Sequence, residues 1–316
     1  MEIRKLQYSG KGTFVLSLPK RWLEQHDLSK GSPFVIQELE HGLYLTPRFA
    51  GSTPKTAVLA VSEHIAREIT ARYTYGYDRI IVKGPITSPT RTVITETLRE
   101  LLGYDIIEEA EDRLVITDLL DPSQLNIEKT LRREFFLASL MVQDALKAWE
   151  TQDAPLARDV IVRDAEVNKL YFLTVRQIRT ALQDTTLAEA IGVRQLESID
   201  LRIVTKDIEG IGDHAASIAR CSLDCGGCPC AFAAPVRELG THALSLATEA
   251  VHSFLQADKE RSSRLLNTKI AFFGEKARLD TEALTCENPL ILHDILENIR
   301  GIGEKAYEIA QLAYKP

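Results

Sequence analysis

The sequence lacks any apolar run long enough to cross a bilayer, and its first residues, MEIRKLQYSGKG, lack the apolar core of a signal peptide. These two absences lead us to expect a cytoplasmic protein with no membrane span. The chain also lacks a Ser/His/Asp or Cys/His arrangement, a phosphate-binding loop and a zinc-hydrolase motif. We therefore expect that the protein is not an enzyme.

The composition of the chain is that of an ordinary globular protein. Of its 316 residues, 45% are hydrophobic and 26% are charged, which excludes a disordered chain and leaves room for two or three domains. The charge is uneven, because residues 1–22 contain five basic residues and one acidic residue while the whole chain carries −7. We expect a multi-domain α+β protein with a basic head and an acidic body.

Residues 1–50 predict a small domain of order β-β-α-β-β. Glycine-rich turns separate β-rich runs, and Pro19 is placed to open a helix. The expected elements are strands at 3–6, 13–18, 34–39 and 43–46, and a helix that ends near Asp27. Because so short a unit buries little apolar surface, we expect it to form a homodimer.

In the stretches RKL (4–6), GKGT (10–13), VLSLPKRW (15–22) and LSKG (28–31), this segment resembles the AbrB/SpoVT family. The resemblance implies an interleaved dimer, a swapped-hairpin β-barrel whose basic face binds DNA. It implies phosphate or groove contacts by Arg4, Lys5, Lys11, Lys20 and Arg21, whose docking would release counterions. The alternative is that the barrel only dimerises and its basic residues keep it soluble.

Residues 55–120 predict a small α/β module of order α-β-α-β-β. The expected elements are a helix at 57–73, a strand at 79–83, a helix at 89–102 capped by Ser88, and strands at 104–109 and 113–118. The module carries no catalytic signature. We interpret it as a structural spacer between head and body, with ligand sensing as the alternative.

Residues 123–316 predict an all-α body. Apolar residues recur at helical spacing in six segments, at about 125–149, 155–182, 189–220, 236–257, 260–285 and 289–313. Residues 207–219 (DIEGIGDHAASIA) align without gaps to residues 298–310 (NIRGIGEKAYEIA). This internal repeat predicts two tandem three-helix bundles, repeat 1 at about 123–230 and repeat 2 at about 235–316.

The best chemical candidates are Glu209 and Asp213. Because they stand four residues apart, both carboxylates project from one helix face, which suits binding of a hard cation. The alternative is a solvated helix face with salt bridges.

The stretches RDAEVNKLY (163–171), VRQIR (175–179) and DIEGIGDHA (207–215) resemble the PhoU family, with Gly210 where that family more often has arginine. The whole chain is similar to the archaeal-type arrangement of an AbrB-like domain ahead of a PhoU domain. The resemblance implies a role in phosphate homeostasis and metal clusters on acidic helix faces. It adds Asp164 and Asn168, on the facing helix, to Glu209 and Asp213 as ligands for Mg²⁺, Ca²⁺, Mn²⁺ or iron.

The second repeat departs from this pattern. Arg300 stands at the position of Glu209, although Glu304 keeps an acid at the position of Asp213 and remains a candidate ligand. Since Arg300 can pair with Glu304 or replace a cation, we expect one metal site rather than two.

Each repeat also carries a Gly-Ile-Gly triplet inside a predicted helix, where each glycine costs about 1 kcal/mol relative to alanine. Such a triplet predicts that another backbone or an ion approaches closely. Residues 210–215 match the dinucleotide fingerprint G-x-G-x-x-A only superficially, because no strand precedes them. His214 is either a ligand or, more ordinarily for a lone helical histidine, a structural hydrogen-bonding residue.

Four of the five cysteines fall in one decapeptide between the repeats: Cys221, Cys225, Cys228 and Cys230. Their sulfurs could converge on zinc or an iron–sulfur cluster, although the spacing matches neither common pattern. Disulfides and free thiols are the alternatives, and Cys286 is expected to be an isolated thiol.

We therefore expect a cytoplasmic regulator of phosphate uptake, with a metal-binding helical body and a dimeric, DNA-binding head. One alternative is an adaptor that acts by protein contact on a phosphate transporter or a signalling kinase. The other is a metal-dependent phosphoryl-handling enzyme that uses Asp164, Glu209 and Asp213.

Overall fold

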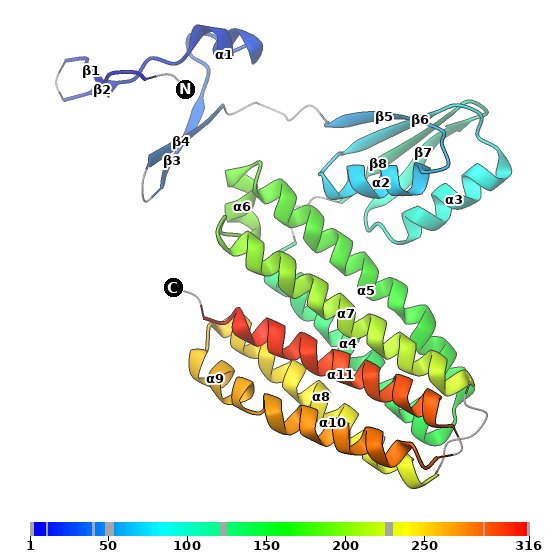
Figure 1. The fold of residues 1–316 in the computed structure, drawn as a ribbon. Coiled ribbons are helices and arrows are strands. Elements are labelled where there is room, and N and C mark those ends of the chain that lie inside the picture. Colours follow the sequence, from blue (N-terminus) through cyan, green and yellow to red (C-terminus); the bar gives the residue numbers. More distant parts are fainter. Residues whose placement is uncertain are drawn as a thin grey trace. The chain divides into compact units, whose positions relative to one another are not determined.

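The computed structural model describes residues 3–10, 12–39, 42–47, 54–120, 125–224, 230–286 and 288–314 (Figure 1). These residues fall into two compact units, Met1–Pro54 and Lys55–Pro316. In the ranges described, the structure contains no helix that is both long and apolar enough to cross a membrane.

The first unit, which we call the head, consists of two antiparallel hairpins and a short helix. Strand β1 (Gln7–Tyr8) pairs with β2 (Phe14–Val15), and β3 (Phe34–Leu39) pairs with β4 (Gly42–Pro47). Helix α1 (Lys20–Gln25) lies between the hairpins in sequence. The β-β-α-β-β order is as predicted from the sequence, but the first hairpin is shorter than expected.

The hairpin of β1 and β2 closes around a tight turn, in which the Ser9 amide donates to the Thr13 carbonyl over 2.9 Å and Gly10 adopts φ +56°. That turn sets the register, so the first strand lies at residues 7–8 instead of 3–6. Among the described residues of the head, none is buried.

Residues 55–120 form a four-stranded sheet of order β5-β6-β8-β7 with two helices, which we call the module. Its elements are β5 (Thr56–Ala60), α2 (Ile65–Thr74), β6 (Arg79–Lys83), α3 (Ser88–Arg99), β7 (Tyr104–Ala110) and β8 (Arg113–Asp118). Helices α2 and α3 pack against each other beside the sheet (Figure 1).

The predicted helix at 57–73 is wrong in its first part. Residues Thr56–Ala60 form a strand parallel to β6, with Ala57 and Leu59 buried and Val58 59% exposed. The five residues are too few to distinguish the two periods, and pairing with β6 decides the outcome. The helix at 88–99 is capped by Thr87, whose Oγ1 accepts from the Thr90 amide, rather than by Ser88.

The all-α body begins with α4 (Ile127–Thr151), α5 (Ala154–Ala181), the short α6 (Thr185–Ile191) and α7 (Glu197–Asp224). It continues with α8 (Cys230–Gln256), α9 (Lys259–Asn267), α10 (Lys269–Ala283) and α11 (Pro289–Gln311). The predicted third helix is divided into α6 and α7, and the predicted fifth into α9 and α10. Asn126, Asp153, Asp184 and Asp258 accept backbone N–H bonds as N-caps of α4, α5, α6 and α9.

The two three-helix units are not separate bundles. Helix α7 packs on α11 and α4 packs on α8, so one apolar core runs through both repeats (Figure 1). Trp149, Phe254, Phe272 and Tyr307 are among the largest fully buried side chains of this core. The central pair α7/α11 therefore joins the two copies of the repeated sequence motif.

A buried arginine holds the module against the body. Arg176 of α5 is 3% exposed and donates to the carbonyls of Tyr73 and Tyr77 over 2.8 and 2.9 Å and to Asp118 Oδ2 over 2.6 Å. Burial raises the pKa of Asp118 even though the Arg176 charge opposes that shift, and burial raises the pKa of Tyr104 to about 12. Because these groups are buried, replacing Arg176 would leave several buried polar atoms without a hydrogen-bond partner.

Candidate functional site

The two Gly-Ile-Gly triplets lie where α7 and α11 face each other, and their first glycines receive side chains from the opposite repeat. A Cβ atom at Gly301 would lie 2.2 Å from His214 Nε2, and one at Gly210 would lie 3.4 Å from Lys305 Cε. His214 and Lys305 occupy equivalent positions in the repeated motif. Each repeat therefore places one side chain over the first glycine of the other, which accounts for the glycines without an ion.

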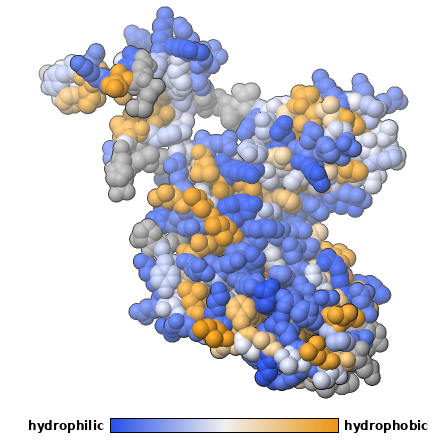
Figure 2. Space-filling model, viewed as in Figure 1, coloured by the Kyte–Doolittle hydropathy of each residue, from blue (hydrophilic) through white to orange (hydrophobic). Residues whose placement is uncertain are grey.

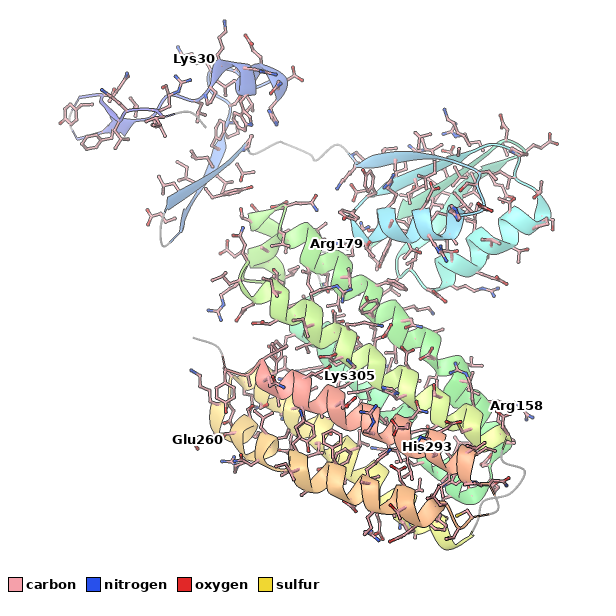
Figure 3. All side chains as sticks on the ribbon, in the orientation of Figure 1. Lys30, Arg158, Arg179, Glu260, His293 and Lys305 are labelled. Carbon is pink, nitrogen blue, oxygen red and sulfur yellow. The ribbon has the colours of Figure 1, made fainter. Side chains whose placement is uncertain are left out.

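Polar contacts follow the same two-fold pattern. Lys305, labelled in Figure 3, donates through Nζ to Asp207 Oδ1 over 2.9 Å. His214 Nδ1 lies 3.0 Å from Asn298 Oδ1. Asp207 and Asn298 are again equivalent positions. His214 thus has a structural hydrogen bond between the repeats, the more ordinary of its two interpretations.

The second glycine of each triplet faces a helix of its own repeat. A Cβ atom at Gly212 would lie 3.4 Å from Val167 Cγ1 of α5, whereas one at Gly303 would lie 2.2 Å from Phe272 Cε1 of α10. Gly212 thus allows α7 to lie close to α5. This close approach brings the predicted metal-binding residues of the two helices to one region.

Asp164 and Asn168 project from α5, and Glu209 and Asp213 from α7; we call these four residues the carboxylate cluster. Asn168 Nδ2 lies 3.5 Å from Asp164 Oδ2. Glu209 is 8% exposed and forms an ion pair with Lys206, one turn earlier on α7, whereas Asp213 is exposed.

The electrostatics of the cluster are those of mutually repelling acids. Burial raises the pKa of Asp164, and the negative charge of Asp213 raises it further. Burial also raises the pKa of Glu209, with Lys206 opposing the shift and Asp213 adding to it. Asp213 therefore lies close enough to both other carboxylates to repel them.

The chemistry of this donor set fits a hard cation. All four residues offer oxygen, and Asp164 Oδ1 is buried without a hydrogen-bond partner among the described residues. A cation at the cluster would satisfy that oxygen and relieve the repulsion, but it would have to displace Lys206 from Glu209.

The carboxylate cluster is nevertheless not a closed ligand shell. Within the described ranges, the one group of three or more His, Cys, Asp or Glu side chains with ligand atoms within 4.8 Å of one another is Asp280, His293 and Glu297. Lys276 Nζ already pairs with Asp280 Oδ2 over 2.6 Å and with Glu297. Hydrogen bonding by Lys276 lowers the pKa of Glu297 to about 2, so this group is an ion-pair network supplied with its own cation.

The second repeat keeps only one of the four oxygen donors of the first, Glu304 at the position of Asp213. Arg300, at the position of Glu209, pairs with Glu304 and donates to Glu297 over 2.7 Å, so the predicted Arg300–Glu304 ion pair is present. Because Phe272 faces Gly303 as Val167 faces Gly212, the positions of Asp164 and Asn168 correspond to Lys269 and Phe273. Neither residue offers an oxygen.

Glu134 of α4, which no sequence motif singled out, lies beside the cluster. Its side chain is fully buried, Thr205 of α7 donates to its Oε2 over 2.8 Å, and Oε1 has no partner among the described residues. Burial raises the pKa of Glu134 well above its usual range, and the charge of Glu209 contributes to that shift. An acid directly before Phe135, within an apolar helical stripe, was the signal in the sequence.

The remaining predicted site residues belong to the head or are cysteines. Arg4, Lys5, Lys20 and Arg21 are exposed in the head, and Lys11 lies outside the described residues. Cys221 and Cys286 are free thiols, and burial raises the pKa of both. Cys225, Cys228 and the side chain of Cys230 lie outside the described part of the chain.

The fold and the cluster define a class of protein: a duplicated three-helix body with an acidic face on its first repeat and no recognisable catalytic centre among the described residues. A family model named PhoU domain matches residues 131–222, which comprise most of α4, α5 and α7. This part of the chain is therefore similar to a PhoU domain.

Known proteins agree with this assignment. The chain is 28% identical over 159 residues to the phosphate-specific transport system accessory protein PhoU of Edwardsiella tarda, a match that covers 46% of this chain and 56% of that relative. The match thus spans little more than half the length of that curated relative.

Two crystal structures share the fold. The structure of PhoU from Pseudomonas aeruginosa has a TM-score of 0.53 at 22% identity and covers 59% of this chain and 93% of its own. The phosphate transport system regulatory protein PhoU from Streptococcus pneumoniae has a TM-score of 0.50 at 17% identity and covers 59% of this chain and 91% of its own.

Proposed function

We propose that the protein is a non-enzymatic regulator of phosphate transport, in which a metal-binding helical body is joined to a dimeric, DNA-binding head. The observation that carries the proposal is the PhoU domain at residues 131–222, with the carboxylate cluster on its α5/α7 face. The phosphate connection comes from the relative of Edwardsiella tarda, which is named as an accessory protein of a phosphate-specific transport system.

The proposed dimer is supported by the exposure of the head, in which no described residue is buried. Its apolar side chains are exposed in the single chain, among them Ile3, Leu6, Tyr8, Phe14, Ile36 and Leu43 at 61–87%. Apolar surface also gathers over the β1/β2 hairpin in Figure 2. Exposed apolar surface of this extent needs a partner, and a second copy of the same hairpins supplies a matching one.

The proposed DNA contact is supported by the charge of the head. Arg4, Lys5, Lys20 and Arg21 are exposed, and the salt bridge of Lys20 to Glu24 spans 3.6 Å between highly exposed groups, which leaves it weak in water. Cations in such positions bind phosphates through release of counterions.

A salt-dependence experiment tests this part of the proposal. Genomic DNA fragments that the full-length protein binds would first be selected. The binding constant K for these fragments would then be measured at several salt concentrations, for the wild type and for the double variant Lys20→Gln/Arg21→Gln. If both residues contact phosphate, the slope of log K against log salt falls in magnitude by about 2. Lys30→Gln removes an exposed head cation outside the proposed contact set, and it should leave the slope unchanged. Identical slopes for all three proteins would remove the DNA-binding role.

The proposed metal site would be held by Asp164, Asn168, Glu209 and Asp213. A bound hard cation would supply positive charge to this face and fix α5 against α7. The test is elemental analysis of purified wild type, of Asp164→Asn/Asp213→Asn and of Glu304→Gln, which changes the equivalent acid of repeat 2. Metal should be lost from the double variant alone, and equal metal content in all three proteins would contradict the site.

An adaptor function is the second candidate, favoured by the word accessory in the name of the relative. In that case the body acts by contact with a transporter or kinase and the head only dimerises. The salt-dependence experiment separates the two, because an adaptor would select no genomic fragment.

A further inference from the structure

A cavity of about 660 Å³ lies between the module and the body. Helices α2 and α3 form its module side, and α5 and α7 form its body side. Ligand pockets have volumes of roughly 300–1,000 Å³ and often lie between domains. The cavity is therefore of the right size and in a common place for a small ligand.

The walls of the cavity are fixed relative to each other. Arg176 joins α5 to the module through buried hydrogen bonds. Arg179, which is labelled in Figure 3, lies one turn further along α5 and donates to Thr74 Oγ1 of α2 over 2.7 Å. Phe172 of α5 also packs against the apolar core of the module. A ligand would thus meet a preformed site, which reduces the entropy lost on binding.

Three arginines line this cavity from three helices: Arg67 of α2, Arg179 of α5 and Arg202 of α7. Most arginines of α4 to α11 form salt bridges, but in the described ranges no carboxylate lies within salt-bridge distance of these three. Their charges are available to an anion, for which planar guanidinium groups are well suited.

Two of these guanidinium groups are held in place by tyrosine rings. Arg179 lies 4.2 Å from the ring centroid of Tyr75, and Arg202 lies 5.1 Å from that of Tyr171 while donating to its hydroxyl over 2.8 Å. Since a guanidinium has five N–H donors and few are used here, most remain free for a ligand. The tyrosines orient the arginines without neutralising them.

The rest of the lining has a different character. Val93, Phe172 and Val175 present apolar surface, and Glu96 and Glu100 of α3 present carboxylates that no described cation pairs with. The cavity therefore combines anion-binding, apolar and hydrogen-bond-accepting walls. A carboxylate is the group that binds ribose hydroxyls in many nucleotide sites.

We propose that this cavity binds a mononucleotide. Its phosphate would contact Arg67, Arg179 and Arg202, its base would lie on the apolar wall with Phe172, and its ribose hydroxyls would donate to the α3 carboxylates. Inorganic phosphate would contact the three arginines but leave the apolar wall exposed to water. A nucleoside would cover the apolar wall but leave the arginines without an anion. The ligand would touch both module and body, which gives the module a sensing role rather than that of a spacer.

Isothermal titration calorimetry on the full-length protein tests this proposal with AMP, ADP, ATP, adenosine and inorganic phosphate as probes. At least one nucleotide should bind with a Kd below about 1 mM and at least about tenfold more tightly than adenosine or phosphate. The proposal would be overturned if no nucleotide binds at concentrations up to about 1 mM, or if inorganic phosphate binds as tightly as the nucleotides do.

Two variants of cavity residues test whether the nucleotide binds in this cavity. Arg67 and Val93 are exposed, so Arg67→Gln and Val93→Trp should leave the fold intact while weakening nucleotide binding by about tenfold or more. Arg99→Gln removes an exposed α3 arginine outside the cavity and should bind as wild type does. Unchanged affinity in both cavity variants would show that the nucleotide binds elsewhere and would refute the assignment. Since the assay contains neither DNA nor added metal, its outcome is independent of the regulatory function proposed above.

Discussion

Replacement of Gly301 by alanine tests whether the repeats interlock through their glycines. In a helix without tertiary contacts, the change stabilises by about 1 kcal/mol. Here the added Cβ would lie 2.2 Å from His214 Nε2, whereas ordinary van der Waals contact begins at 3.4 Å. The imidazole must therefore move by more than 1 Å and give up its hydrogen bond to Asn298.

The magnitude follows from these opposing effects. Overpacking of this kind costs about 1–3 kcal/mol and the lost hydrogen bond about 1 kcal/mol, against a helix-propensity gain of about 1 kcal/mol. We expect Gly301→Ala to lower the free energy of unfolding by about 1–3 kcal/mol. In a His214→Ala background the obstruction is absent, and the same change should be neutral or stabilising.

Urea unfolding followed by far-UV circular dichroism measures the four proteins of this double-mutant cycle. The coupling energy between positions 214 and 301 should be about 1–4 kcal/mol, the difference between the loss in the wild type and the neutral or stabilising effect in the His214→Ala background. Gly210→Ala is the matched control, because its Cβ would meet only the flexible Lys305 side chain at 3.4 Å. A coupling energy near zero, or equal losses for the two glycine variants, would refute the interlocked arrangement.

Three further predictions concern other parts of the body. Gly303→Ala, with its Cβ 2.2 Å from buried Phe272, should lower the urea midpoint, and an unchanged midpoint would contradict the packing at this position. Burial raises the pKa of Asp207 to about 6. Between about pH 4 and pH 6 the native protein therefore keeps a proton on Asp207 that the unfolded chain has lost, and the free energy of unfolding falls as the pH rises through this range. Asp207→Asn should therefore raise the free energy of unfolding by on the order of 2 kcal/mol at pH 7 and by little at pH 4, even though it removes the ion pair with Lys305. A lower free energy of unfolding at both pH values would contradict this prediction. Arg176→Gln should destabilise the contact between module and body by about 3–5 kcal/mol. Hydrogen exchange should then become faster in β8 but not in α4, and the same change in both elements would show that Arg176 does not hold the module.

The sequence predicted the elements whose signals are local. The six helical segments of the body carry long 3.6-residue periodicity, and the alignment of 207–219 with 298–310 predicted the duplication. The five-residue strand β5 was missed, because Thr56–Ala60 becomes a strand by pairing with β6, a partner more than twenty residues away. Glu134 was missed because its chemistry depends on burial, which one helix alone does not determine.

By itself, the sequence determined the helical body, its duplication and which residues offer oxygen or positive charge, because periodicity and residue type act over one or two turns. Tertiary structure decided what those residues meet. Identical Gly-Ile-Gly triplets receive Lys305 in one repeat and His214 in the other, and Arg67, Arg179 and Arg202 meet at one cavity although α2, α5 and α7 are far apart in sequence. Such meetings depend on long-range packing of whole helices, which no local pattern contains.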